Sequence, residues 1–298
     1  MDHNLTKKTK QPEPAETKAS LFWFRRYYSP ICMRVAFLFL CFWSLSIQIG
    51  FAQLRKSLNP PAPGFDKVGS DARAVQIADA VMDAVGGRAA WDDTQLITWN
   101  FDGKRRLVWD KWSGDVRVDN LYNDQTVLLN INNDMGRVFR NGEELTQPDS
   151  VARYVKQGKL NWVIDSYWLL MPFKLKDTGV TLTYIGNELT QAGKPADVLQ
   201  LTFKNGTTLA GGKYKVWVDK KSRLVTQWAQ YTNPADATPL FTLPWDDYEQ
   251  HGNILLSSDR GDHELTDIMV FTGLPGEVFS DFTRTDLSRY PQAKQGLR

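Results

Sequence analysis

The chain beyond residue 52 contains no cysteine. Only two cysteines occur among the 298 residues, and both of them, Cys32 and Cys41, lie near the N-terminus. The remainder of the chain can therefore form no disulfide framework, no cysteine-ligated zinc site and no thiol nucleophile. A domain of this length can fold on its apolar core alone, so the lack of disulfides is compatible with export from the cytoplasm.

Histidine is equally scarce. The three histidines are His3, His251 and His263, and none of them belongs to an HExxH motif or to a pair with metal-ligand spacing. The sequence also lacks the GxSxG motif of a nucleophile elbow. Without a catalytic or metal-binding constellation, we expect no enzymatic activity, no metal and no cofactor.

The sequence has no clustered positive charge outside its N-terminal region. Residues 1–52 contain seven of the 36 lysines and arginines and three of the 34 acidic residues, which leaves 29 basic and 31 acidic residues in the rest of the chain. Nucleic-acid binding favours a clustered basic face. We therefore expect no nucleic-acid partner.

One long apolar run is present, and it lies near the N-terminus. Met33 and Arg34 precede VAFLFLCFWSLSI, and small residues follow in GFA. This pattern predicts a signal peptide over residues 33–52, cleavage between Ala52 and Gln53, and a periplasmic protein. The alternative is a retained inner-membrane anchor over residues 35–54. Residues 1–32 are interpreted as a disordered extension, or as a segment upstream of a true start at Met33 rather than Met1.

The pattern after residue 52 predicts a linker, a helix and then strands. Residues 53–70 contain three prolines and no periodicity, which is typical of a linker. An amphipathic helix is predicted from Ser70 or Asp71 to the stop at Gly86-Gly87. The apolar period then changes to two, with turn residues between the segments, as expected for successive antiparallel strands that each have one solvent-exposed face.

Residues 148–172 interrupt the strands. They predict one or two short helices that begin near Asp149 or Ser150 and end at Pro172, after which the strand pattern resumes. The expected fold class is mainly β, with a curled antiparallel sheet of about eleven strands, an N-terminal helix and a mid-chain helical lid. The expected domain spans residues 71–283, and residues 284–298 form a tail.

Aromatic residues are abundant. Nine of the eleven tryptophans lie beyond residue 52. Four of them, Trp99, Trp109, Trp217 and Trp228, lie on predicted strands, and Trp162 and Trp168 lie on the helical cover. One interpretation is a large aromatic core. The other is a curled sheet whose bulky apolar residues surround a cavity for a hydrophobic ligand. The sequence pattern alone supports both.

Three blocks carry a resemblance to a known family. They are WNFDGKRRLVWDKWSGDVRVD at 99–119, YWLLMPFKLKDTGVTLTY at 167–184 and KYKVWVDKKSRLVTQW at 213–228. Together with the order of elements, they resemble the lipoprotein-carrier superfamily of LolA/LolB-like fold, and in particular the outer-membrane lipoprotein-sorting-like proteins of Bacteroidetes-type bacteria. The resemblance covers residues 71–283.

The resemblance implies an unclosed half-barrel with acyl chains in its hollow and helices at its mouth. The wall and lid of that cavity would then be formed by Trp99, Phe101, Leu107, Trp109, Trp168, Leu169, Met171, Phe173, Trp217 and Trp228. The family places an Arg-Pro pair after its second strand that is important for lid opening. This sequence has Lys111-Trp112 there, so these two residues are the candidates for gating.

Three functions remain open at this point. The first is an exported, monomeric carrier of a hydrophobic ligand, a lipid or lipoprotein acyl chain, that exchanges its cargo with membrane-bound donor or acceptor proteins. The second is a membrane-anchored periplasmic sensor or interaction domain that uses the same fold without transport. The third, an enzyme acting on a lipid, has no catalytic motif to support it.

Overall fold

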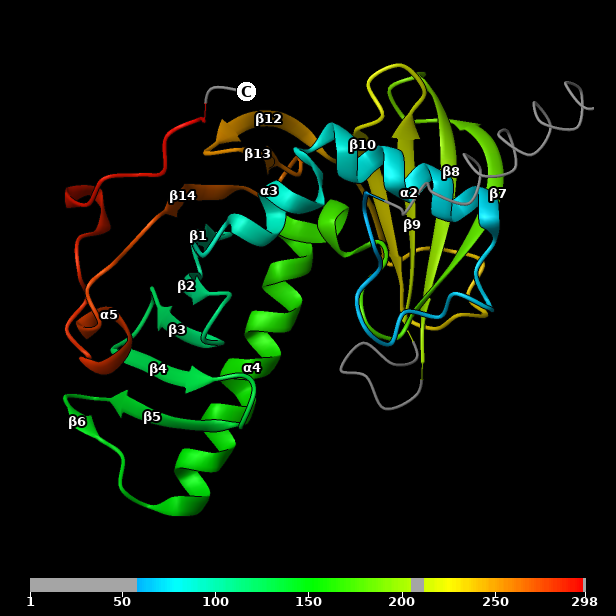
Figure 1. The fold of residues 1–298 in the computed structure, drawn as a ribbon. Helices are drawn as coiled ribbons and strands as arrows, with labels where there is room; N and C mark the ends of the chain where they lie inside the picture. Colours follow the sequence, from blue (N-terminus) through cyan, green and yellow to red (C-terminus); the bar gives the residue numbers. More distant parts are fainter. Residues whose placement is uncertain (1–57, 205–211, 297–298) are drawn as a thin grey trace, which may run out of the picture. The chain divides into compact units, whose positions relative to one another are not determined.

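The structure is a computed structural model that describes residues 58–204 and 212–296 (Figure 1). The predicted extension, the signal or anchor segment and the cleavage site at Ala52 and Gln53 lie outside these residues. Among the helices that the structure describes, none has the length and apolar character needed to cross a membrane.

Fourteen strands form three antiparallel sheets in the described part of the chain. The seven-stranded sheet has the order β14-β1-β2-β3-β4-β5-β6, formed by Leu265–Phe271, Leu96–Phe101, Arg105–Asp110, Asp115–Asn120, Gln125–Asn130, Met135–Arg140 and Glu143–Glu144. The five-stranded sheet has the order β11-β10-β9-β8-β7, formed by Phe241–Pro244, Val225–Tyr231, Lys213–Asp219, Pro195–Phe203 and Val180–Leu189. Strands β12 (Asp246–His251) and β13 (Ile254–Asp259) form a separate hairpin.

The expected fold class is confirmed, because the chain is mainly antiparallel sheet that does not close. The strands number fourteen instead of about eleven. The two-residue strand β6 contains no apolar residue, and β11 and β12 are separate strands with only Trp245 between them. The pairing shifts register in β1/β14, β7/β8 and β9/β10. Such irregularities increase the local twist, which allows long sheets to curl.

The predicted mid-chain helices are one long helix and a turn. Helix α4 spans Pro148–Leu170, with proline in its first turn, and continues into the 3₁₀ turn η1 at Met171–Lys174. It packs on β3, β4 and β5, across one face of the seven-stranded sheet (Figure 1). Gly158 permits this close approach, because a Cβ atom there would lie 2.9 Å from Val127 Cγ1. The main apolar core lies beneath α4 and includes the inward faces of both large sheets.

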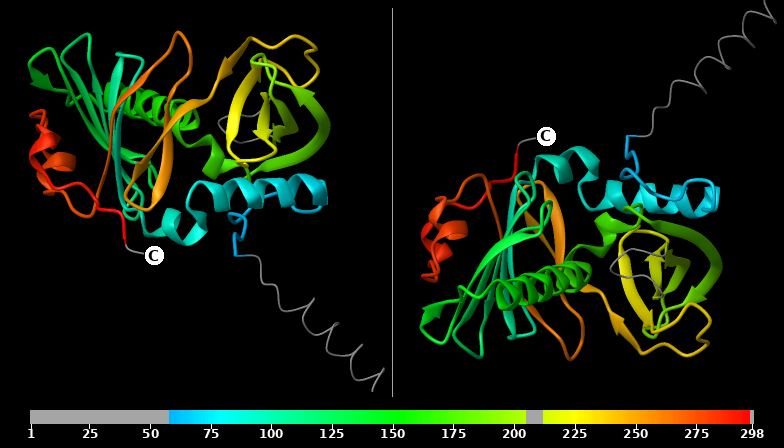
Figure 2. Two further views of the ribbon diagram at one scale, coloured as in Figure 1. Left: turned by 90° about the horizontal axis from the view of Figure 1, so that it is seen from above. Right: turned by 90° about the horizontal axis from the view of Figure 1, so that it is seen from below.

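The other face of the seven-stranded sheet, expected to be exposed to solvent, is covered by the C-terminal segment. Helix α5 (Glu277–Ser280) and the 3₁₀ turn η2 (Leu287–Arg289) lie on the side of the sheet opposite α4 (Figure 2). Arg117, which is fully buried, donates hydrogen bonds to the carbonyl oxygens of Val278, Asp281 and Phe282. Leu287, from the region assigned to the tail, is buried in the same layer.

The N-terminal helix forms as predicted, and a second helix follows it. Helix α2 spans Ala72–Ala84, and Asp71 precedes it. The Asp71 carboxylate accepts a hydrogen bond from the backbone N–H of Tyr184, at 2.8 Å, which ties the start of the helix to β7. After the turn at Gly86, helix α3 spans Gly87–Asp93. This short helix was not predicted, and it contributes to the cleft described below.

Candidate functional site

Nine of the ten predicted cavity residues belong to the main core. They are Trp99, Phe101, Leu107, Trp109, Trp168, Leu169, Met171, Phe173 and Trp228. Trp217 lies apart from them, in a small cluster with Val198 and Tyr231. The inward-facing residues of β9 are Tyr214, Val216 and Val218, so Trp217 projects from the opposite face of the sheet.

The surroundings of Trp168 are filled by aromatic rings. Its indole lies 4.9 Å from the ring of Trp228, 5.4 Å from that of Phe101, and 5.3 Å from those of Phe241 and His263, between centroids. These are the edge-to-face and tilted geometries favoured by aromatic pairs in protein cores. Trp168 itself is 9% exposed. The arrangement around this residue is that of a packed core.

A cleft with aromatic walls lies at the edge of this core. Its volume is about 400 Å³, and its wall comes from the lead-in, α2, α3, the end of β2, α4 and η1. We call it the aromatic cleft and define it by its lining residues, Pro60, Ala62, Met82, Arg88, Trp91, Asp92, Trp109, Lys111, Trp112, Trp162, Phe173, Lys174, Lys176 and Asp177. The structure thus brings together four of the residues singled out from the sequence: Trp109, Phe173, Lys111 and Trp112.

Four aromatic side chains form a continuous apolar wall. Trp91 stacks on Phe173, with ring centroids 4.6 Å apart and planes at 22°. Trp109 lies 6.3 Å from Trp91 and packs edge-to-face against Trp162 at 5.2 Å. Side chains of this kind line most sites for apolar ligands. The cleft can therefore accept an apolar group by contact with ring faces.

Lys111 places a cation inside this aromatic wall. It follows Trp109 by two residues, directly after the end of β2, and lines the same cleft. Its Nζ lies 3.9 Å from the centre of the Trp91 ring and donates hydrogen bonds to the carbonyl oxygens of Trp91 and Thr94. Burial lowers the pKa of Lys111 to about 8, against the opposing effect of the Asp92 charge.

The remaining charged residues of the cleft are paired with one another or with nearby groups. The Arg88 Nε donates to both carboxylate oxygens of Asp92, at 2.8 and 2.9 Å. Lys174 pairs with Asp177. Burial alone would raise the pKa of Asp177, but the charge and hydrogen bond of Lys174 outweigh it and hold that pKa below its usual value.

Two indole N–H groups in the wall have no hydrogen-bond partner among the described residues. They are the Nε1 atoms of Trp109 and Trp162. By contrast, Trp112 is 63% exposed at the rim, and its Nε1 donates to the Asp92 carbonyl oxygen at 3.0 Å. Buried tryptophan N–H groups usually find an acceptor. Both atoms are themselves buried, and the Nε1 atoms of Trp99, Trp228 and Trp245 in the core are likewise without a partner among the described residues.

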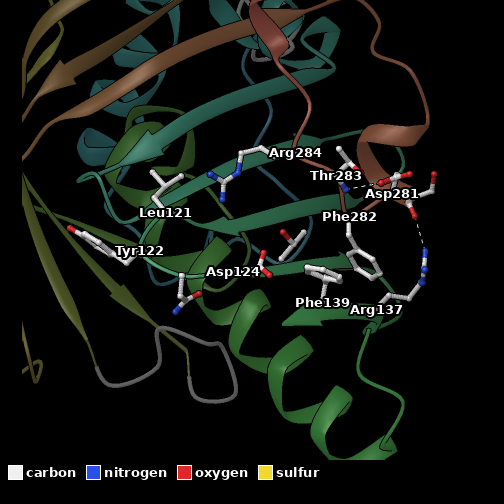
Figure 3. Close-up of a pocket in the computed structure, with 12 residues that line it drawn as sticks. Leu121, Tyr122, Asp124, Arg137, Phe139, Asp281, Phe282, Thr283 and Arg284 are labelled. Carbon is white, nitrogen blue, oxygen red and sulfur yellow. Dashed lines mark hydrogen bonds between the residues drawn. The ribbon is translucent and has the colours of Figure 1, made fainter. Parts of the chain in front are cut away.

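A second, larger pocket lies on the outer face of the seven-stranded sheet (Figure 3). Its volume is about 770 Å³, and it is bounded by β4, β5 and the C-terminal segment. Its aromatic floor is closed by the stacking of Phe139 on Phe282 at 5.3 Å, and Arg137 is held by Glu144 and the Ser280 carbonyl oxygen. Five aromatic residues line the aromatic cleft and three line this pocket, so the aromatic cleft is the stronger candidate for an apolar ligand.

Sequence reasoning missed Trp91 and Arg88, which helix α3 carries into the cleft. The signal available was the segment GRAAWDD, a run of helix-forming residues directly after Gly86. Trp162 was assigned to the helical cover but not to the cavity wall. Its place on α4, eleven residues before Phe173, brings it to the same cleft.

Comparison with family models and with curated proteins gives no match. Among solved structures, the chain is similar to a putative outer membrane lipoprotein-sorting protein domain from Vibrio parahaemolyticus, with 12% identity and a TM-score of 0.39 over 71% of this chain and 99% of that one. It is also similar to a DUF1329 family protein from Desulfovibrio piger, with 14% identity and a TM-score of 0.40 over 69% of this chain and 96% of that one. A third similarity is to MucB in complex with MucA(peri), with 11% identity and a TM-score of 0.19 over 69% and 58%.

One of these similar solved structures is itself described as a putative outer membrane lipoprotein-sorting protein domain. At these identities and TM-scores, the likeness carries no inference about ligand or activity. The assignment to a Bacteroidetes-type branch stays a prediction.

Proposed function

We propose that this protein binds the apolar chain of a lipid-class ligand in the aromatic cleft and carries it in the periplasm. The observation that supports this proposal is the wall formed by Trp91, Trp109, Trp162 and Phe173 around a cleft of about 400 Å³. Clefts of this size with apolar walls and a few placed polar groups are typical ligand sites.

Burial of an alkyl chain supplies most of the free energy needed for micromolar binding. Each buried methylene contributes roughly 0.8 kcal/mol, so a chain of about ten methylenes contributes roughly 8 kcal/mol before ordering costs. A dissociation constant of 1 μM corresponds to about −8 kcal/mol. Ring contacts and a polar head group would offset part of the ordering cost.

The wider core contributes to this proposal as a support for the cleft. The nine core residues predicted to line a hollow belong to one apolar cluster, in which Trp168 and Trp228 pack edge-to-face at 4.9 Å. In the proposed function they hold the inner wall of the cleft, while the ligand contacts the edge of the core. Of the two residues proposed for gating, Trp112 is exposed at the rim of the cleft and Lys111 lies inside its wall.

Export forms part of the proposal. A carrier would begin at Gln53 after signal cleavage and exchange its ligand with membrane-bound partners, whereas a sensor would keep residues 35–54 as an anchor. The intact mass of the protein isolated from its native cells distinguishes these forms. A mature N-terminus at Gln53 supports the carrier, and a membrane-bound form that retains residues 35–54 would favour the sensor.

Ligand binding is tested by titrating a fluorescent fatty-acid analogue into protein freed of bound lipid. We expect saturable binding with a dissociation constant of about 1 μM or lower, and about tenfold weaker binding for Trp91→Ala. Tyr122→Ala is the matched control, since Tyr122 is 75% exposed and lines the outer pocket. Absence of saturable binding by the wild type contradicts the proposed function.

A further inference from the structure

The charged residues of the aromatic cleft differ in how they are paired. Of the four cations in its wall, three form ion pairs with carboxylates of the protein: Arg88 with Asp92, Lys174 with Asp177, and Lys176 with Asp79. The fourth is Lys111. Within residues 58–204 and 212–296, its Nζ contacts no carboxylate within ion-pair distance and is bonded to two backbone carbonyl oxygens.

The hydrogen bonds of Lys111 leave one donor for another partner. An ammonium group has three N–H donors, and the carbonyl oxygens of Trp91 and Thr94 take two of them. The third is left to the face of the Trp91 ring, 3.9 Å from Nζ, or to a ligand in the cleft. A carboxylate or phosphate oxygen is a much stronger acceptor for this donor than an indole face.

Charged groups of both signs surround Lys111. Asp92 and Asp93 on α3 favour its protonated form, and Arg88 on the same helix opposes it. Across the cleft, Lys174 and Asp177 form a pair of their own. The protonated amine is disfavoured chiefly by burial, and an anion in direct contact with Nζ would form an ion pair that none of these carboxylates makes.

We propose, on the basis of the proposed function, that the ligand is a single-chain amphiphile with an anionic head group, whose carboxylate or phosphate forms an ion pair with Lys111. The chain then lies against Trp91, Trp109 and Phe173. Because the bound anion stabilises the ammonium form, binding above pH 8 is accompanied by uptake of one proton at Nζ.

The test compares four twelve-carbon ligands below their micellar concentrations by calorimetry on the full-length protein freed of lipid. They are dodecanoate, dodecyl phosphate, dodecanol and dodecylammonium. At pH 7 we expect at least one of the two anions to bind about tenfold more tightly than dodecanol, and dodecylammonium to bind most weakly. The tighter of the two anions identifies the head group as carboxylate or phosphate.

Variants of Lys111 test the assignment to this residue. The readout is the ratio of anion affinity to dodecanol affinity, which we expect to fall about tenfold in Lys111→Met and to be retained in Lys111→Arg. Lys221→Met is the matched control, since Lys221 is exposed and lies outside the residues that line the cleft. Circular dichroism and the urea midpoint verify that each variant is folded.

The pH dependence gives a second readout. The wild-type anion preference should decline at least fivefold between pH 7 and pH 10 as Lys111 loses its proton, because both anions stay ionised over this range. Lys111→Arg should abolish this decline, since arginine stays charged. An anion preference that survives in Lys111→Met, or dodecanol bound as tightly as both anions, overturns the inference and leaves the proposed function intact. Failure of all four ligands to bind overturns the proposed function as well.

Discussion

Truncation of Trp168 to alanine measures whether the centre of the molecule is a packed core or a ligand cavity. Trp168 is 9% exposed and contacts the rings of Phe101, Trp228, Phe241 and His263 at centroid distances of 4.9 to 5.4 Å. Removal of a tryptophan from such a site leaves a cavity and costs about 3–5 kcal/mol in the free energy of unfolding. Each lost edge-to-face contact contributes about 0.5–1.5 kcal/mol to the aromatic part of that cost.

The assay is urea unfolding followed by circular dichroism, which does not depend on the deleted fluorophore. With a denaturant slope of about 3 kcal/mol per molar urea, the midpoint should fall by about 1–1.7 M. Trp112→Ala is the control, because Trp112 is 63% exposed and should cost below about 1 kcal/mol. If Trp168→Ala costs no more than Trp112→Ala at an unchanged slope, Trp168 faces empty or adjustable space, and the packed-core interpretation is refuted.

Three further predictions concern stability. Burial would raise the pKa of Asp119, but its paired arginines hold that pKa below its usual value. The ionised carboxylate therefore stabilises the fold above about pH 4, and this stability is lost as the pH falls through the lowered pKa. Asp119→Asn should lower the urea midpoint at pH 7 and should lose less further stability between pH 4 and pH 2 than the wild type does. Gly158→Leu should cost about 1–3 kcal/mol, measured by thermal unfolding, because a side chain there collides with Val127; an unchanged melting temperature would contradict the close packing of α4. Arg260→Met should lower the free energy of unfolding, measured by urea denaturation, by about 2–3 kcal/mol, because it removes two hydrogen bonds to the carbonyl oxygen of Trp168 near the end of α4. A decrease below about 0.5 kcal/mol would show that this buried guanidinium does not hold the helix.

Local patterns predicted the elements well. The period-two segments became antiparallel strands, and the apolar residues that they place on the inward face, such as Trp99 and Leu107, form the core. The position of Trp217 could also have been predicted from the sequence. Lys213 and Lys215 lie on the same face of β9 as Trp217, and two lysines indicate a face outside the main core. The error came from grouping tryptophans by residue type instead of by strand face.

Long-range contacts set the limits of sequence reasoning. The outer face of β3 carries Arg117 and Asp119, a pattern that reads as exposed to solvent, yet the segment that covers it lies about 160 residues later in the chain. The alternation of apolar and polar residues along β3 contains no information about this contact with the C-terminal segment. The cleft is similar, since Trp91, Lys111 and Phe173 meet only through the packing of α3 and η1 at the end of β2.

The most direct test of the central claim is to locate a bound chain on the protein. A fatty acid with a photoreactive diazirine in its tail is bound, irradiated and mapped by peptide mass spectrometry. The account predicts labels on the aromatic cleft, in the peptides that contain Trp91, Trp109 and Phe173, and their loss when unlabelled dodecanoate competes. Labels confined to the outer pocket around Tyr122 and Phe282, or labels that no competitor removes, would contradict it.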